Sequence, residues 1–316
     1  MSLVSIIIPA YNEAENIPHI TSALGKTMET SRYEYEIIIV NDGSTDSTAR
    51  VIQELSLQNP HLLYIELSKN YGHQLALKAG MDHAKGDCVI SMDCDMQHPP
   101  EMIPSMLEKW EEGYEVVYTL RKDDAEQSRR KRITSKLFYK VINKIANIRL
   151  EDGTADFRLV DRRIVDILKK FKENDPFLRG LLKWIGFRQY AITYQPGQRY
   201  AGKSKYTLRK MLSLAIHGVM SFSIRPLYLA VYLGLGFSAL SVLYIPYVLF
   251  AFYSGTEVPG WASVIMTIVF FGGLQLSVLG IIGIYVGKIF MQTKNRPNYI
   301  VRATNIVNQS YDIAKF

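Results

Sequence analysis

Two aspartates separated by a single residue follow an apolar run in the segment ISMDCDMQHPP, residues 90–100. When both are ionised, Asp93 and Asp95 repel each other, and a cation between them removes that penalty. Carboxylate oxygens suit hard divalent ions such as Mg²⁺, whereas Cys94 between them would suit softer metals. The spacing alone leaves an ordinary solvated turn as an equal alternative, so the surrounding elements must decide between the two.

Short apolar runs rich in Ile and Val alternate with helical patterns through the first 120 residues. Strands are expected at 4–9, 35–42, 62–68, 87–93 and 114–120, and helices at 13–28, 46–58, 73–84 and 100–112. Because the apolar runs mostly lack the alternation of half-exposed strands, they predict an open α/β sheet, largely parallel and covered on both faces. Such sheets bind ligands at the carboxyl ends of their strands.

Polar segments follow the first four expected strands, at residues 9–13, 41–44, 69–72 and 93–95. Each segment alone is compatible with ordinary turn chemistry, but four of them converging on one sheet edge predict a ligand site. The chain has neither a G-x-G-x-x-G segment after the first strand nor a Walker A sequence. A dinucleotide-binding fold and a P-loop are therefore not expected.

The overall composition limits the classes of partner and compartment. The 316 residues carry a net charge of +7, which favours acidic partners such as anionic lipid, phosphorylated substrate or nucleic acid. Two cysteines give no disulfide framework, so free thiols in a reducing compartment are expected. The start, MSLVSIIIPAYNE, lacks a basic region and is not expected to be a signal peptide.

Two uncharged stretches, residues 226–256 and 258–287, follow this polar part of the chain. Each exceeds the roughly 20 residues that cross a bilayer. They predict a transmembrane hairpin over 226–290, with spans at about 227–253 and 261–287. Basic residues flank the hairpin on both outer sides, so both termini and the catalytic domain are expected in the cytoplasm of an integral protein of the inner or plasma membrane.

The remaining boundaries follow from this hairpin. We expect a cytoplasmic catalytic domain over 1–204, an interfacial amphipathic helix over 205–225 and a cytoplasmic tail over 291–316. The basic, amphipathic stretch 121–148 is expected to lie in the lipid headgroup layer together with 205–225.

Several segments together resemble the family 2 glycosyltransferases, whose nucleotide-binding fold is called GT-A. They are SIIIPAYNEAENI, EIIIVNDGSTDST, LSKNYGHQLALKAGMDHAKGD, VISMDCDMQHPPEMIP and GTADFRLVDRR. The resemblance covers roughly residues 3–225. With QRYAGKSKYTLRKM and two spans, the chain is most similar to the polyprenyl-phosphate subgroup, which includes dolichol-phosphate mannose synthases and bactoprenol-phosphate glucosyltransferases.

The resemblance implies that the acid pair holds Mg²⁺ or Mn²⁺ against the donor's diphosphate. Asp95 is then the more direct ligand with Gln97 nearby, while Asp93 completes the metal shell or faces the ribose. A divalent ion offsets the charge that grows on the departing nucleoside diphosphate. His98 stands where the family often has an acid, and we interpret it as incidental.

The resemblance also assigns residues to the nucleotide sugar. They are Pro9, Ala10, Tyr11, Glu13, Asp42, Lys69, Asp93 and Asp95. Asp42 is the strongest candidate among the base and ribose contacts, because a carboxylate at that point can accept hydrogen bonds from a uracil or guanine edge.

The lipid phosphate is assigned to Arg121, Arg132, Ser135 and Arg199, since the guanidinium fork can hold phosphate through two hydrogen bonds. Asp156 is expected near the anomeric carbon, as a base or as a positioning group. A base is not strictly required, because a phosphate monoester with a second pKa near ~6 is mostly dianionic at neutral pH. Arg158 could equally form a structural pair with Asp156.

The resemblance thus implies metal-dependent transfer of one sugar to undecaprenyl or dolichyl phosphate, with inversion, by attack of the lipid phosphate. Glucose from UDP-glucose is the first choice, and mannose from GDP-mannose is the alternative. A processive polysaccharide synthase would need more spans and a Gln-x-x-Arg-Trp signature, and a non-catalytic nucleotide-sugar sensor or scaffold would not need these acids. Membrane lipids are expected partners and nucleic acid is not, while a homo-oligomer stays open.

Overall fold

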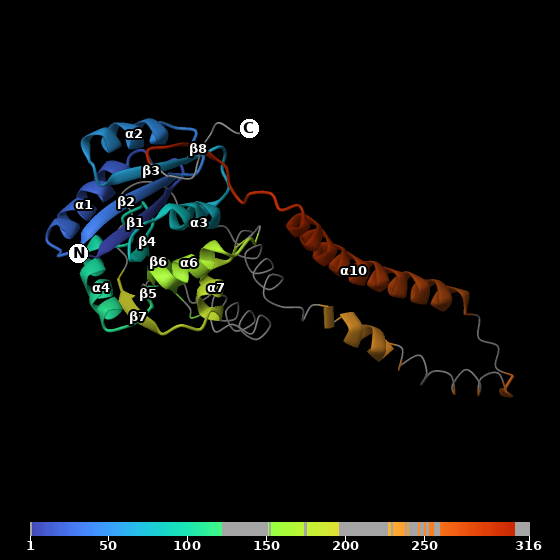
Figure 1. The fold of residues 1–316 in the computed structure, drawn as a ribbon. Coiled ribbons are helices and arrows are strands. Elements are labelled where there is room, and N and C mark those ends of the chain that lie inside the picture. Colours follow the sequence, from blue (N-terminus) through green and yellow to red (C-terminus); the bar gives the residue numbers. More distant parts are fainter. Residues whose placement is uncertain are drawn as a thin grey trace.

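The computed structural model describes residues 2–121, 151, 153–173, 176–195, part of 227–255, and 260–306. In these parts a mixed eight-stranded sheet has the order β7-β5-β6-β4-β1-β2-β3-β8 (Figure 1). The strands are β1 (Leu3–Ala10), β2 (Glu34–Asn41), β3 (Leu62–Leu67), β4 (Cys88–Ser91), β5 (Val116–Arg121), β6 (Thr154–Asp161), β7 (Gln189–Tyr194) and β8 (Val301–Thr304). The helices are α1 (Ile17–Glu29), α2 (Thr48–Gln58), α3 (His73–His83), α4 (Ile103–Glu111, after the 3₁₀ turn η1, Pro100–Met102), α6 (Arg162–Lys169), α7 (Leu178–Trp184) and α10 (Trp261–Thr293).

Helices cover both faces of the sheet, which explains why the strands carry apolar residues without alternation. Ile6 and Ile8 pack with α1, α2 and α4 on one face. Their neighbour Ile7 packs with α3, α6 and α7 on the other. All three isoleucines are fully buried. The expected strands and helices of the first 120 residues are confirmed to within a few residues at their ends.

The sheet differs from a mainly parallel one because two of its strands are antiparallel to their neighbours. β1 to β4 are parallel, but β6 inserts antiparallel between β4 and β5, pairing Ser91 with Arg158 and Tyr118 with Arg158. No local pattern announces this insertion, since β6 comes from a segment more than 30 residues beyond β5. The insertion brings Asp156 to the same sheet as the acid pair.

The chain after α10 returns to the catalytic domain. Strand β8 pairs antiparallel with β3, Tyr299 Oη donates to Asp82 Oδ2 at 2.9 Å, and Arg302 Nη2 donates to the Ser68 carbonyl at 2.8 Å. Ile306 is buried in the core. Part of the expected cytoplasmic tail over 291–316 thus covers the edge that β3 would otherwise expose, and its cytoplasmic location stays a prediction.

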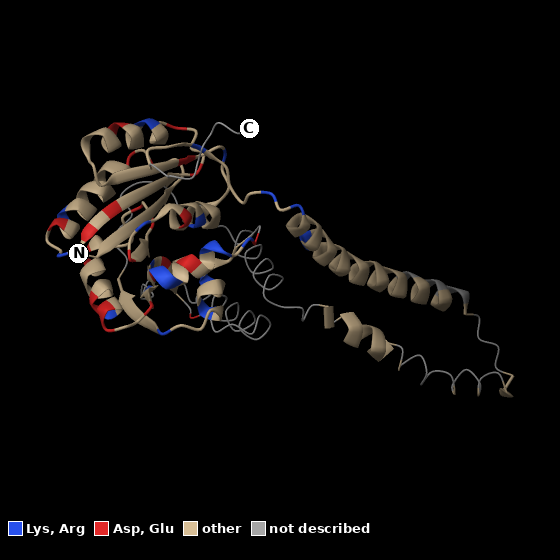
Figure 2. Cartoon of the chain, viewed as in Figure 1, with Lys and Arg blue, Asp and Glu red and all other residues tan. Residues whose placement is uncertain are grey.

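Helix α10 projects away from the sheet (Figure 1). An 18-residue window within 266–293 has a mean hydropathy of 2.0 and contains no residue that is described as buried. Helix α10 is the one helix in the described residues that is long and apolar enough to cross a membrane. Figure 2 shows charged residues on the part of the chain that contains the sheet and at the adjoining end of α10. Nearly half of the first expected span lies outside the described residues. Within the described part, the Phe237 ring packs 5.2 Å from the Phe271 ring of α10.

Candidate active site

The loops after β1 and β2 are tied together at the carboxyl edge of the sheet. The Asn12 N–H donates to Ser44 Oγ at 3.0 Å, and Asn12 Oδ1 accepts the Thr45 N–H at 2.8 Å. Asn12 has a φ of 55°, a left-handed conformation that asparagine tolerates better than most residues. The first two polar segments predicted from the sequence therefore form one unit.

Asp42 connects this unit to the loop after β3. Its two carboxylate oxygens accept the Tyr71 N–H at 2.7 Å and the Gly72 N–H at 2.9 Å. Burial raises the pKa of Asp42, although these hydrogen bonds act in the opposite direction. The side chain thus already has backbone partners, and its predicted contact with the base or ribose would use the remaining lone pairs.

The other residues predicted to bind the nucleotide lie on the same edge. Pro9 and Ala10 are buried at the end of β1, and Glu13 accepts a hydrogen bond from Asn16 Nδ2 at 2.6 Å. The Lys69 ammonium is exposed and lies 5.1 Å from the centre of the Tyr71 ring. Their ligand contacts stay predictions.

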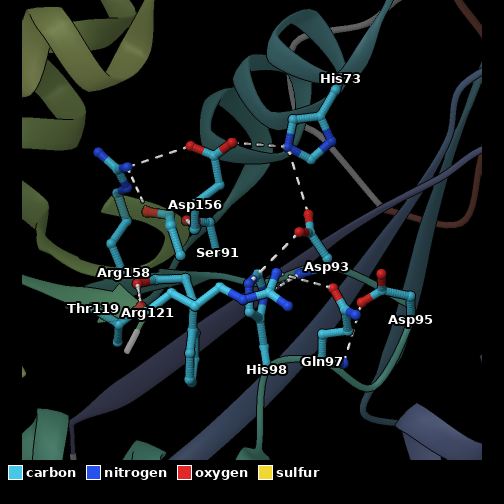
Figure 3. Close-up of polar contacts among 12 residues, drawn as sticks. His73, Ser91, Asp93, Asp95, Gln97, His98, Thr119, Arg121, Asp156 and Arg158 are labelled. Carbon is cyan, nitrogen blue, oxygen red and sulfur yellow. Dashed lines mark hydrogen bonds and ion pairs between the residues drawn. The ribbon is translucent and has the colours of Figure 1, made fainter. Parts of the chain in front are cut away.

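The acid pair occupies the loop after β4 (Figure 3). Asp95 Oδ1 accepts the Gln97 N–H at 3.2 Å across Met96, whose φ of 62° makes the turn. The Asp93 side chain remains 39% exposed. The loop therefore fixes the backbone of the pair while leaving the Asp93 carboxylate accessible.

His98 is not incidental. Its ring is buried, stacks on Phe157 at 5.2 Å between centroids, and accepts the Asp93 N–H on Nδ1 at 2.9 Å. Burial lowers the pKa of His98, so the neutral imidazole that this hydrogen bond requires is favoured. His98 holds the main chain of the acidic loop, which the sequence did not reveal.

Asp156 on β6 is surrounded by cationic side chains. Arg179 binds it through two hydrogen bonds, Nε to Oδ1 at 2.8 Å and Nη2 to Oδ2 at 2.7 Å, and Arg158 Nη2 lies 3.3 Å from Oδ1. Burial acts to raise the pKa of Asp156, but Arg179, His73 and Arg158 together hold it well below its usual range. Burial lowers the pKa of Arg158 to about 10. The expected Arg158–Asp156 pair is present, and Arg179 is the stronger partner.

His73 and Arg179 were missed in the sequence. His73 opens α3 and its Nε2 lies 3.3 Å from Asp156 Oδ2 and 3.6 Å from Asp93 Oδ1. The sequence did contain a signal for His73. It follows the loop after the third expected strand, and the other predicted site residues also lie in loops that follow strands. Arg179 had no such signal, since α7 meets β6 only through tertiary packing.

Arg121, predicted to bind the lipid phosphate, ends β5 beside the acidic loop. Its Nη1 lies 3.5 Å from Gln97 Oε1, and its buried Nε has no hydrogen-bond partner among the described residues. Arg121 therefore keeps a hydrogen-bond donor that the described residues do not use. The other residues predicted for this phosphate, Arg132, Ser135 and Arg199, lie outside the described residues.

The donor atoms at this edge fit a hard divalent ion. Asp93, Asp95 and the Gln97 amide offer oxygen only, and no three His, Cys, Asp or Glu residues cluster as a metal site within the described ranges. That set suits an ion which takes its remaining ligands from phosphate and water. Both thiols are buried, and burial raises the pKa of Cys94 above that of an ordinary thiol, so it stays protonated.

The sheet carries a pair of aspartates at the carboxyl ends of its strands, together with an arginine that can bind phosphate. This arrangement is typical of nucleotide-sugar transferases with the GT-A fold. The family model described as Glycosyl transferase family 2 matches residues 5–168. The chain therefore belongs to glycosyl transferase family 2, as its sequence motifs predicted, and it is a hexosyltransferase.

Relatives extend the similarity over almost the whole chain. It is 42% identical to "Uncharacterized glycosyltransferase YkcC" of Bacillus subtilis (strain 168), over 94% of this chain and 93% of that one. It is 38% identical to "SfII prophage-derived bactoprenol glucosyl transferase" of Shigella flexneri, over 96% and 98%. Among solved structures, the mannosyltransferase PcManGT from Pyrobaculum calidifontis in complex with GDP-Man and Mn²⁺ aligns at 19% identity and a TM-score of 0.49, over 70% of this chain and 64% of that one.

Proposed function

We propose that this enzyme transfers a single glucose from UDP-glucose to a polyprenyl phosphate at a membrane surface. The site observation that carries the proposal is the exposed Asp93 carboxylate in the loop whose Gln97 lies 3.5 Å from Arg121, a cation whose buried Nε has no partner in the described chain. Negative and positive groups so arranged suit a metal–diphosphate complex. Similarity to the bactoprenol glucosyl transferase of Shigella flexneri supports glucose as the sugar and a lipid as the acceptor.

A divalent ion, Mg²⁺ or Mn²⁺, would be held by Asp95, Asp93 and Gln97 and would offset charge on the departing diphosphate. Arg121 is positioned to bind an anion next to Gln97, which suits the donor diphosphate as well as the lipid phosphate predicted from the sequence. Asp156 serves best as a positioning group, because a carboxylate whose pKa is held far below neutrality is a weak base. The dianionic lipid phosphate is nucleophilic without one. Its attack on the anomeric carbon from the face opposite the diphosphate would invert the configuration.

The membrane part of the proposal rests on α10 and on the packing of Phe237 against Phe271. Both support a hairpin that anchors the catalytic domain at the membrane. The basic residues outside the hairpin favour the cytoplasmic side, where nucleotide sugars are available. A cysteine at Ser254, between the spans, should be labelled from outside intact cells, and one at Ser44 should not. The reverse pattern would overturn this orientation, and the native thiols, both buried, should add little background.

The direct test incubates membranes containing the protein with radiolabelled nucleotide sugars and undecaprenyl phosphate or dolichyl phosphate. We expect a metal-dependent glycolipid from UDP-glucose, absent for Asp95→Ala. Product from GDP-mannose instead would select the mannosyltransferase alternative. Binding of nucleotide sugar without any lipid product across the panel would overturn the proposal and favour a non-catalytic sensor.

A further inference from the structure

His73 stands between the two acidic groups of the site. It is the first residue of α3 and follows Gly72, whose φ of 96° turns the chain into the helix. Its Nε2 faces Asp156 Oδ2 at 3.3 Å and Asp93 Oδ1 at 3.6 Å (Figure 3). These two carboxylates determine which way the imidazole ring is turned.

The other ring nitrogen of His73, Nδ1, makes no contact with the residues drawn in Figure 3. With Nε2 directed at the carboxylates, Nδ1 lies on the opposite side of the ring. The His73 side chain is 41% exposed, whereas the Asp156 side chain beneath it is 7% exposed. The imidazole thus forms part of the open surface of the site.

His73 faces both carboxylates, but the charge of Asp156 does not depend on it alone. Arg179 already binds Asp156 through two hydrogen bonds, and Arg158 adds a further cationic contact. An additional imidazole is not needed to keep this carboxylate ionised. The position of His73 is better explained by a substrate group that binds between Asp93 and Asp156.

We propose that His73 binds the hexosyl group during transfer, with Nδ1 at a sugar hydroxyl, and so contributes to the choice of sugar. Asp93 belongs to the loop assigned to the donor diphosphate and Asp156 is expected near the anomeric carbon, so the sugar should lie beside both carboxylates. This inference rests on the proposed function, since it assumes that a hexose passes from a nucleotide to an acceptor. A site that hydrogen-bonds a substrate hydroxyl discriminates strongly against analogues that misplace it.

The test compares wild type with His73→Ala and His73→Gln by calorimetry in Mn²⁺, using the nucleotide sugar that the wild type accepts and the matching nucleoside diphosphate. We expect affinity for the nucleoside diphosphate to stay within about twofold, while the extra affinity contributed by the sugar is lost. Transfer should fall by about 10- to 100-fold, the usual range for losing a hydrogen bond in a site. The preference for the accepted sugar over its 4-epimer should shrink.

His61→Ala is the matched control, because that ring stacks on Tyr35 at the end of β2 away from the site and its loss should leave both affinities unchanged. Equal losses of nucleoside diphosphate and nucleotide sugar in His73→Ala would overturn the inference and make His73 a support for the acidic loop. An unchanged sugar preference with unchanged affinities would also overturn it. A wild type that transfers no sugar would instead refute the proposed function, and the calorimetric comparison at His73 would then use the nucleotide sugar that the wild type binds most tightly.

Discussion

The two acidic parts of the site differ in what compensates their charge. Asp156 is buried and receives two hydrogen bonds from Arg179 and an ion pair from Arg158. Asp93 is 39% exposed, and within the described chain its ion-pair partners are two imidazoles at 3.6 Å, one of which, His98, is favoured in its neutral form by burial. Protein groups compensate the charge of Asp156, whereas at Asp93 we propose that a metal ion and a diphosphate provide the compensation.

This difference explains how a fold can keep several acids together without losing stability. A buried carboxylate needs hydrogen-bonded cations throughout, because an uncompensated buried charge costs several kcal/mol. In a partly exposed pair, water screens the repulsion between the two carboxylates until a metal ion and a diphosphate bind. Each of the following changes should affect one part and spare the other.

The largest effect is expected at the acid pair. Asp95→Ala removes a metal ligand, so transfer should fall by about 1,000-fold or more, comparable with the loss of a major electrostatic group from other active sites. Unfolding in the presence of EDTA should remain close to wild type. Asp166→Ala, a change of an exposed acid on α6, serves as the control and should leave transfer intact. Full activity of Asp95→Ala would contradict the proposed role of Asp95 as a metal ligand in transfer.

A large effect on stability is expected from Arg179→Leu. Removing one partner of a buried pair typically costs about 3–5 kcal/mol, which urea unfolding at pH 7 would measure. The pKa of Asp156 is depressed in the folded protein, so its contribution is present above the ordinary aspartate pKa and is lost as pH falls through the folded value. In the variant this loss should begin at higher pH. Identical acid profiles for the two proteins would contradict the assignment of Arg179 as the main compensating group.

The smallest effect is expected at Tyr299→Phe, on the segment between α10 and β8. The variant loses one hydrogen bond to Asp82 of α3 and should be less stable by about 1 kcal/mol. Because this contact lies outside both acidic parts, affinity for metal and nucleotide should not change. A loss of metal binding here would indicate that the packing of the C-terminal segment controls the site.

The first half of the fold could be predicted because its signals are local. Apolar runs such as 4–9 and 35–42 mark strands directly, and polar residues at their ends mark the site, including Asp42, Asp93 and Asp95. The parallel pairing of β1 with β2 and of β2 with β3 joins strands that are consecutive in sequence, so it could be predicted from the same local signals.

The second half could not be predicted in the same way because its pairings are distant. β6 inserts between β4 and β5, and β8 crosses back from beyond α10 to β3. These arrangements depend on tertiary contacts. The pairing of Arg179 with Asp156 and the hydrogen bond from the Asp93 N–H to His98 therefore became visible only in the structure. Residues Arg132, Ser135 and Arg199 stay predictions.

The central claim is that Asp156 is compensated by the protein and Asp93 by its ligands. Its most direct test measures the free energy of unfolding of Asp156→Asn and Asp93→Asn by urea, first in EDTA and then with Mn²⁺ and a nucleoside diphosphate. In EDTA, Asp156→Asn should be destabilised by about 3–5 kcal/mol, because Arg158 and Arg179 lose their anion, and Asp93→Asn should be unchanged or slightly stabilised. With ligands, Asp156→Asn should gain as much stability as wild type, and Asp93→Asn should gain less. A destabilised Asp93→Asn in EDTA together with an unaffected Asp156→Asn would contradict the account.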